Sequence, residues 1–199
     1  RALSLVETEY VLFSLEDYFI GKKVKNYEID DILDFMSKNK INCYKLYPWP
    51  KSNTKFRDGK FKHLHGYKKN DAYAINGALS IFKTDFLIKI LKKCVDAKTC
   101  FDFEYYYLNN KENVNDTIDF TSICYDDRDI LGYHNGIIRG KWLWSTVKYY
   151  KKQGLNIDFS NREKMSFSQT FFYLLRFNMP QTIKKILRKT IKQSNLGLK

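Results

Sequence analysis

The chain has 199 residues, of which 44% are hydrophobic and 17% aromatic, so it can bury the core of one domain and is not a disordered protein. Its formal net charge of +13 indicates an acidic partner, such as nucleic acid, an anionic membrane surface or a phosphorylated small molecule. There is no apolar run of about 18 residues, and no signal-peptide pattern, so the sequence predicts no membrane-spanning segment.

The four cysteines form no CxxC pair and show no Cys/His spacing typical of zinc. We expect them to be reduced and mostly buried, as in a cytosolic protein. The chain begins with Arg1. We expect further residues upstream of it.

The first predicted element is a short apolar strand over residues 11–15, followed by two adjacent carboxylates, Glu16 and Asp17. Ligands gather at the carboxyl ends of strands in open α/β sheets, and paired carboxylates suit a hard divalent cation. An exposed turn is the alternative. Tyr18 and Phe19 follow directly and would enclose the carboxylates, which favours a metal site because a buried carboxylate without a partner is costly.

The next elements follow from periodicity. Residues 26–38 predict an amphipathic helix that Asn39 and Lys40 end, and residues 41–46 predict a strand that a turn at 47–50 closes. Residues 51–70 are polar, basic and aperiodic. We expect a mobile or substrate-covering loop there.

Further along, residues 72–82 predict a strand and turn, and Thr84 is expected to be the N-cap of the following helix. A short helix is expected to contain residues 101–108. Residues 117–124 are strand-like, and residues 125–129 form a charged turn.

In the last part of the chain, residues 130–139 predict a strand or loop, and residues 142–152 a helix that Gly154 ends. Two helical stretches follow, 166–178 and 180–193. The sequence contains no internal repeat. The order of elements predicts an α/β fold.

Asp102 and Glu104 form a second pair of carboxylates, set among aromatic residues. A general base needs a carboxylate held by rigid packing, and aromatic neighbours raise its basicity by excluding water. The alternative is a helix N-terminus, where the dipole favours acidic residues. Both interpretations can hold together.

A third candidate site contains His134, Arg139 and Lys141 around two glycines. One imidazole and two cations beside glycines suit close backbone approach to a phosphate and charge pairing with it. The alternative is a structural histidine.

In their order along residues 1–165, these three sites resemble the C-terminal portion of a GT-A glycosyltransferase, the nucleotide-sugar-dependent type that builds bacterial or viral surface polysaccharides. In that family an apolar strand ends in an acidic motif, often Asp-x-Asp, and residues 10–19 resemble it. Residues 74–87 loosely resemble the family's acceptor-side strand and following helix. Here the motif is Glu-Asp, because Leu15 stands two positions before Asp17, and the usual N-terminal nucleotide-binding strands are absent from the chain.

The resemblance implies a partial GT-A-like mixed sheet flanked by helices over residues 1–165, and a basic helical tail over 166–199. It implies a metal-dependent transfer of a sugar from a nucleotide-sugar donor to a glycan or lipid-linked acceptor, in the cytoplasm. Asp17 with Glu16 would hold Mn²⁺ or Mg²⁺. The donor would be bound by His134, Arg139 and Lys141, and the base would be Asp102 or Glu104, of which we prefer Glu104.

Residues 170–199 carry seven basic residues and no acidic one. Residues 180–193 predict an amphipathic helix whose cations suit peripheral contact with an anionic membrane at the inner face, with a helix packed on its own domain as the alternative. A rival function is nucleic-acid binding, since cations alternate with aromatic residues. The sequence has no zinc finger, RNP-like motif or recognition helix, so we expect no nucleic acid. A third possibility is a truncated, non-catalytic glycosyltransferase remnant.

Overall fold

The computed structural model describes residues 2–47, 51–52, 54–69, 71, 73–109, 118–128, 130–138 and 140–178. Contacts divide the chain into two compact units, Arg1–His134 and Asn135–Lys199, whereas the sequence predicted a boundary between residues 165 and 166. The predicted helix 180–193, the turn residues 48–50, Arg139 and the side chain of His134 lie outside the described residues.

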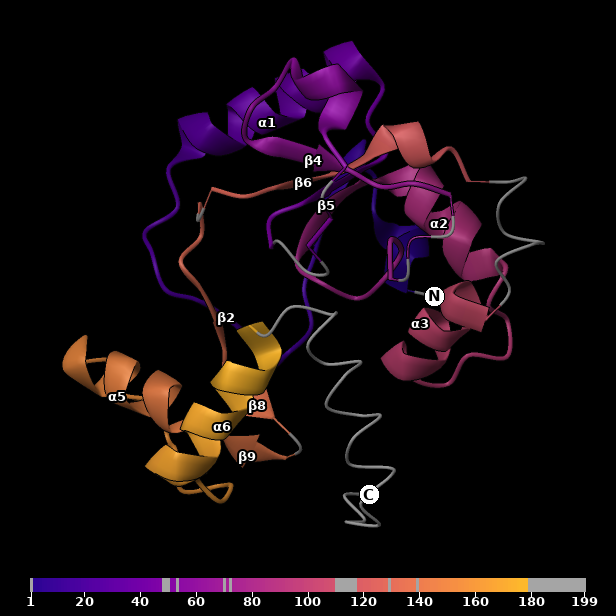
Figure 1. Ribbon diagram of the computed structural model, residues 1–199. Coiled ribbons are helices and arrows are strands. Elements are labelled where there is room, and N and C mark those ends of the chain that lie inside the picture. The colour runs from indigo at the N-terminus through magenta and orange to yellow at the C-terminus, as the bar shows by residue number, and fades with distance from the viewer. Residues whose placement is uncertain are drawn as a thin grey trace, which may run out of the picture. The chain divides into compact units, whose positions relative to one another are not determined.

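The first unit contains a five-stranded mixed sheet (Figure 1). Its strand order is β1 (Tyr10–Phe13), β5 (Ser80–Lys83), β3 (Cys43–Lys45), β6 (Ile123–Asp126) and β4 (Leu64–Gly66). β3 and β6 are parallel, and the other neighbours are antiparallel. The predicted α/β class with a mixed sheet is confirmed.

Helices cover both faces of this sheet. α1 (Asn26–Asn39) buries Ile32 and Met36 in a cluster that includes Tyr44 and Cys124. α2 (Thr84–Lys92) and α3 (Cys100–Asn109) pack with the other face, in a cluster that includes Cys43 and Ile123. Figure 1 shows the two sets of helices on opposite sides of the strands. Successive side chains of a strand point to opposite faces, which is why Cys43 and Tyr44 enter different clusters.

The predicted end of α1 is confirmed, but the predicted N-cap of α2 is wrong. α1 ends where Lys40 adopts a left-handed conformation, as the sequence indicated. Thr84, however, is the first helical residue of α2 and not its N-cap. Its hydroxyl donates to the Thr8 carbonyl at 2.7 Å, which ties the helix start to the segment before β1.

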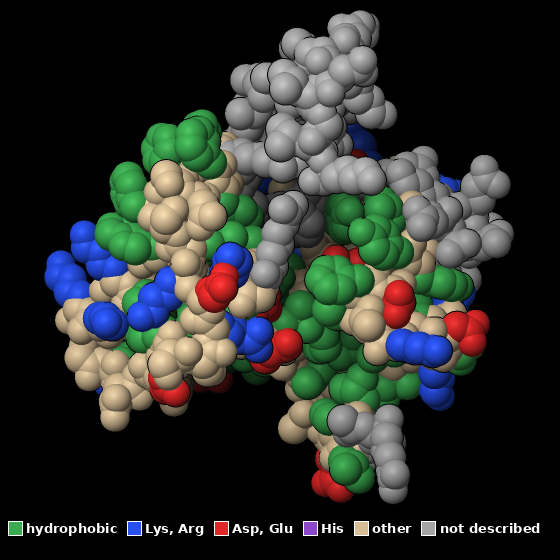
Figure 2. Space-filling model, turned by 90° about the horizontal axis from the view of Figure 1, so that it is seen from below, with side chains coloured by type: hydrophobic (Ala, Val, Ile, Leu, Met, Phe, Trp, Pro, Cys, Tyr) green, Lys and Arg blue, Asp and Glu red, His purple; other side chains and the backbone are tan. Residues whose placement is uncertain are grey.

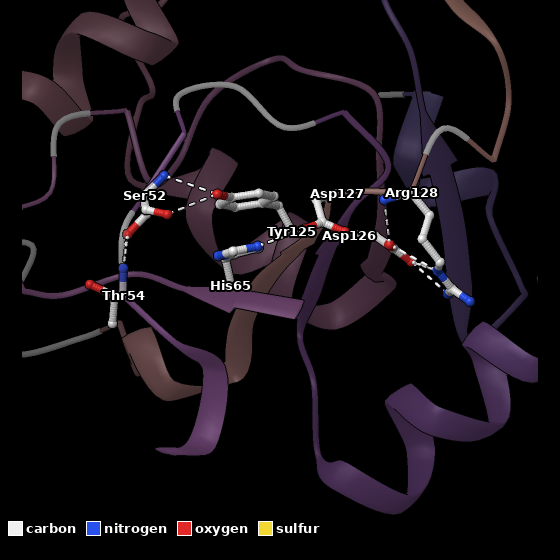
Figure 3. A network of polar contacts seen from close by, with 7 residues as sticks. All are labelled: Ser52, Thr54, His65, Tyr125, Asp126, Asp127 and Arg128. Carbon is white, nitrogen blue, oxygen red and sulfur yellow. Dashed lines mark hydrogen bonds and ion pairs between the residues drawn. The ribbon is translucent and has the colours of Figure 1, made fainter. Parts of the chain in front are cut away.

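The prediction of a loop over residues 51–70 is wrong in part. This segment contains a short 3₁₀ helix, η2 (Phe56–Gly59), and β4, which forms the edge of the sheet beside β6. Figure 3 shows how the segment is fastened to β6. Ser52 donates its N–H to the Tyr125 hydroxyl at 3.2 Å, and the His65 ring stacks on the Tyr125 ring at a centroid distance of 4.7 Å.

The charged turn predicted at 125–129 begins later than expected, because β6 runs from Ile123 to Asp126 after a 3₁₀ turn, η3 (Phe120–Ser122). Asp126 is fully buried at the end of this strand. Its carboxylate accepts hydrogen bonds from the Tyr44 hydroxyl at 2.5 Å and from Arg128 Nη2 at 2.6 Å, the latter drawn in Figure 3. The guanidinium therefore neutralises a carboxylate that the sequence pattern placed in solvent.

After β1 the chain turns into β2 (Tyr18–Ile20), which pairs with β7 (Tyr133–Asn135). Gly21 donates its N–H to the carbonyls of Leu131 and Gly132 at 3.0 and 2.9 Å. Gly132 has a φ of +58°, a value that favours glycine.

The second unit contains a hairpin of β8 (Ile137–Ile138) and β9 (Lys141–Trp142), followed by α5 (Trp144–Lys152) and α6 (Phe167–Asn178). Both helices agree with the sequence within two residues, and Gly154 follows the end of α5 with a φ of +71°. Trp142 is buried against Phe159 and donates its indole N–H to Asn161. Among the described residues, no helix combines the length and the apolar character that a membrane crossing requires.

Candidate active site

Asp17 lies in the turn between β1 and β2, where the sequence placed a metal ligand. Its side chain is half-buried, and Oδ1 is buried without a hydrogen-bond partner among the described residues. Burial raises the pKa of this carboxyl group, and the neighbouring charge of Glu16 raises it further. Glu16 itself is exposed. Asp17 is therefore the enclosed member of the pair.

Glu104 reaches the same site from α3. Its Oε1 accepts a hydrogen bond from the Gly77 N–H at 2.9 Å. Burial raises the pKa of Glu104, the Gly77 hydrogen bond and the Lys45 charge act in the opposite direction, and the charge of Asp17 raises it again. Asp17 and Glu104 are 87 positions apart in the sequence, and the fold brings their charges within reach of each other.

Two features position Glu104. Phe103 and Tyr107 are buried one helical turn apart, and the Tyr107 hydroxyl donates to the Ile90 carbonyl, so α3 is fixed against α2. Gly77 provides the close backbone approach. A Cβ atom there would lie 3.2 Å from Leu15 Cδ1 and 3.5 Å from Glu104 Oε1, so a side chain would press on both residues.

Lys45 is the residue of this site that sequence reasoning missed. It is fully buried at the end of β3, and its Nζ donates to the Tyr73 carbonyl and to Asn76 Oδ1, both at 3.0 Å. The ammonium also lies 4.7 Å from the centroid of the Tyr67 ring. Burial lowers its pKa to about 8, opposed by the charges of Cys43 and Glu104. A lysine inside an apolar strand was the available signal.

Lys45 and Glu104 bind adjacent residues of the loop that precedes β5. Lys45 binds Asn76, and Glu104 binds the backbone of the next residue, Gly77. Tyr73, whose carbonyl Lys45 also binds, has a φ of +62°, an uncommon value for a residue with a side chain. These contacts make the arrangement of the site depend on Lys45.

The structure gives Asp102 a capping role. Its Oδ2 accepts hydrogen bonds from the N–H groups of Lys98 and Thr99 at 3.0 and 2.8 Å, and the Thr99 hydroxyl accepts from the Asp102 N–H. This is a capping box at the start of α3. The hydrogen bonds from Thr99 and Lys98 lower the pKa of Asp102, whose carboxyl is exposed. Two residues apart on a helix, Asp102 and Glu104 point in different directions.

The third predicted cluster is not assembled by the described contacts. Lys141 belongs to the second unit, where its Nζ lies 2.5 Å from Glu163 Oε2. Arg139 and the side chain of His134 lie outside the described residues. No contact among the described residues therefore supports the proposed donor-binding role of these three residues.

A cleft of about 450 Å³ is lined by Asn76 and Phe103, the sequence neighbours of Gly77 and Glu104, although neither Asp17 nor Glu104 lines it. The thiol of Cys100 lines it, and burial together with the charges of Glu104, Glu16 and Asp17 raises the pKa of this thiol. Asn76, the partner of Lys45, lines it as well. The rest of the wall is mainly apolar and includes Phe13, Phe82, Leu87, Leu91, Val95 and Phe103. A substrate in this cleft would lie beside the candidate site.

Asp17 and Glu16 meet some, but not all, of the requirements of a site for a hard divalent cation. Within the described ranges, no group of three or more His, Cys, Asp or Glu side chains is arranged to hold a metal ion. Mg²⁺ is commonly held by only one or two carboxylates together with substrate phosphates. The unpaired Oδ1 of Asp17 is suited to coordinate an ion bound in this way. The site is therefore compatible with a cation that arrives with a phosphorylated substrate.

Comparisons with known proteins gave no match: no family model, no curated protein and no solved structure is significantly similar to this chain.

Proposed function

We propose that the chain is a metal-dependent glycosyltransferase that moves a sugar from a nucleotide-sugar donor to a glycan or lipid-linked acceptor. One observation carries the proposal. Asp17 and Glu104, the preferred metal ligand and the preferred base from the sequence, are far apart in the chain, yet the charges of both raise the pKa of the same thiol, Cys100, which lines a cleft. The unpaired buried Oδ1 of Asp17 supports it.

In this proposal Asp17, assisted by Glu16, would hold Mn²⁺ or Mg²⁺. The cation would supply charge neutralisation for the leaving diphosphate. Glu104 accepts the proton of the acceptor hydroxyl, which becomes the nucleophile at the sugar. The N–H of Gly77 orients the Glu104 carboxylate, and the raised pKa of Glu104 makes it a stronger base than an exposed glutamate. Lys45 is a positioning residue, because it acts through Asn76 and the loop that carries Gly77.

The test is release of nucleoside diphosphate from a panel of nucleotide sugars, with and without Mn²⁺ and with candidate acceptors. Asp17→Asn removes the charge at nearly constant volume, and we expect it to lower turnover by about 100-fold or more. Asp102→Asn is the matched control, because it changes an exposed capping carboxylate of the same type. We expect its turnover to remain within about threefold of the unmodified chain, since it affects only the helix cap.

Two results would overturn the proposal. One is the lack of any donor binding or hydrolysis across the panel. The other is full activity of Asp17→Asn, because the proposed site would then play no part in the reaction.

A further inference from the structure

Helix α6 carries large apolar side chains that point away from its own unit. Phe167, Phe171 and Phe172 are exposed by 61, 53 and 66%, and Leu174 and Leu175 by 37 and 51%. A surface helix of a globular protein normally turns such residues toward the core. We call these five side chains together with Trp144 the aromatic face.

The opposite side of α6 explains this orientation. Thr170 is buried, and its hydroxyl accepts a hydrogen bond from the Trp144 N–H at 3.3 Å. The Tyr173 hydroxyl accepts one from Asn135 Nδ2 at 3.2 Å. Residues 170 and 173 lie on one side of a helix with 3.6 residues per turn, and residues 171 and 175 lie on another. α6 is thus held to its unit by polar contacts, and its apolar side is left outside.

The aromatic face is a connected surface. The Phe167 ring contacts the Trp144 ring edge-on at a centroid distance of 5.1 Å, and it stacks on Phe171 at 6.4 Å. Phe171 and Phe172 meet at 5.9 Å. A contiguous exposed patch of this kind marks an interaction site, whereas single exposed apolar residues do not.

Positive charge is concentrated in the unit that carries this face. Residues 135–199 hold 14 of the 35 lysines and arginines but two of the 22 acidic residues, so they carry twelve of the thirteen net positive charges. Lys148 Nζ lies 4.9 Å from the centroid of the Trp144 ring, and Lys151 and Lys152 are exposed at the end of α5. On the left of Figure 2, where Figure 1 places α5 and α6, hydrophobic side chains gather beside Lys and Arg side chains.

We propose that the aromatic face inserts into the interfacial region of an anionic lipid bilayer while the α5 lysines contact the lipid headgroups. Aromatic rings suit this region because they have an apolar body at headgroup depth, and leucines add apolar area. Nucleic acid would use the cations and rings but has no use for Leu174 and Leu175, so the composition of the face favours lipid. The inference is independent of the proposed reaction, because it concerns the second unit alone.

The first experiment measures co-sedimentation of the whole chain with phosphatidylcholine vesicles, with and without phosphatidylserine. We expect binding that requires the anionic lipid, and a loss of about tenfold in the partition coefficient for Phe172→Ser. Phe101→Ser is the matched control, because Phe101 is 64% exposed in the first unit. Its partition coefficient should change by less than about twofold. Equal losses for the two variants would contradict the assignment of the face.

A second experiment tests the charges. Lys151→Gln with Lys152→Gln should lower binding to anionic vesicles by about tenfold, since each headgroup-facing lysine contributes. Lys89→Gln with Lys92→Gln removes the same charge from the end of α2 and should have little effect. Fluorescence of Trp144 adds an independent signal. Its emission should shift to shorter wavelength with anionic vesicles, and Trp144→Phe should remove that shift.

If a partner other than a lipid bilayer covers the aromatic face, these experiments would give different results. Concentration-dependent dimerisation that Phe172→Ser abolishes, without vesicle binding, would show that a second copy covers the face. Oligonucleotide binding that competes with vesicles and is lost in Phe172→Ser would show a nucleic-acid surface. Either result would overturn the proposal, provided that circular dichroism shows the variants to be folded.

Discussion

The two units of this chain handle charge in opposite ways. The first, Arg1–His134, holds 21 basic and 20 acidic residues, and among its described residues Lys45 and Asp126 are buried. The second, Asn135–Lys199, is strongly basic and leaves an apolar helix face outside. The net charge of the chain therefore describes the second unit and says little about the chemistry of the first. In the first unit charged side chains are buried inside the fold, whereas in the second they give the surface a net positive charge.

The sharpest test of the first unit is Glu104→Gln. Glutamine keeps an oxygen that can accept the Gly77 hydrogen bond but cannot take a proton, so the loop should hold while turnover falls by about 10²–10⁴-fold. In the unmodified chain, activity should fall as the pH drops through a pKa above the ordinary value for glutamate, because the base becomes protonated. Initial rates across pH, with donor saturating, would measure both effects. Retained activity in Glu104→Gln with a loss in Asp102→Asn would identify Asp102 as the base.

Glycines with a positive φ occur in both units, and they differ in how much space surrounds an added Cβ atom. Gly132→Ala tests a position in the first unit where that space is occupied. An added Cβ would lie 2.5 Å from Lys22 Cγ and 3.0 Å from the Lys22 backbone nitrogen, at a φ of +58°. The side chain can move but the backbone nitrogen cannot move easily, so we expect a loss of about 2–4 kcal/mol in the free energy of unfolding. Urea denaturation followed by circular dichroism would measure it. An unchanged midpoint would mean that the backbone just before β7 tolerates a side chain at position 132.

Local patterns predicted the regular elements best. α1 and α6 have apolar residues at helical spacing, and β1 is a short apolar run, so periodicity and composition were sufficient for each, although β1 ends at Phe13, before the predicted Leu15. β4 was missed because its three residues lie in a polar, basic segment and pair with β6, which is about 60 positions away. A strand of three residues is too short to show an alternation of apolar and polar residues, so only its pairing with a distant strand identifies it.

The candidate site was predictable to the extent that its residues are acidic and adjoin aromatic residues in the sequence. Asp17 and Glu104 satisfied that condition, and so did Asp102, which the fold uses as a helix cap. Lys45 did not, because its role depends on contacts with Tyr73 and Asn76, 28 and 31 positions later. Such contacts come from the path of a loop, and the pattern of a strand does not contain them.

The buried Lys45 predicts a pH dependence of stability that Lys45→Met should lack. Its pKa is about 8 in the folded chain against 10.5 for the free side chain, so between these values the unfolded chain binds a proton that the folded chain does not. Stability relative to the Lys45→Met variant should therefore rise from pH 8 to pH 10.5, by no more than about 3 kcal/mol. Taking the difference between the two proteins removes most of the contribution of buried tyrosines and cysteines. A flat difference would show that Lys45 titrates normally.

The smallest effect is expected for Gly154→Ala in the second unit. Gly154 also has a positive φ, +71°, but nothing lies within 4 Å of an added Cβ. The substitution therefore adds backbone strain without a collision, and we expect a loss of about 1 kcal/mol in the free energy of unfolding. Urea denaturation monitored by Trp142, buried in the same unit, would measure it beside Gly132→Ala. If both variants lose the same free energy, strain alone explains the two glycines. A larger loss in Gly132→Ala means that close packing against Lys22 contributes as well.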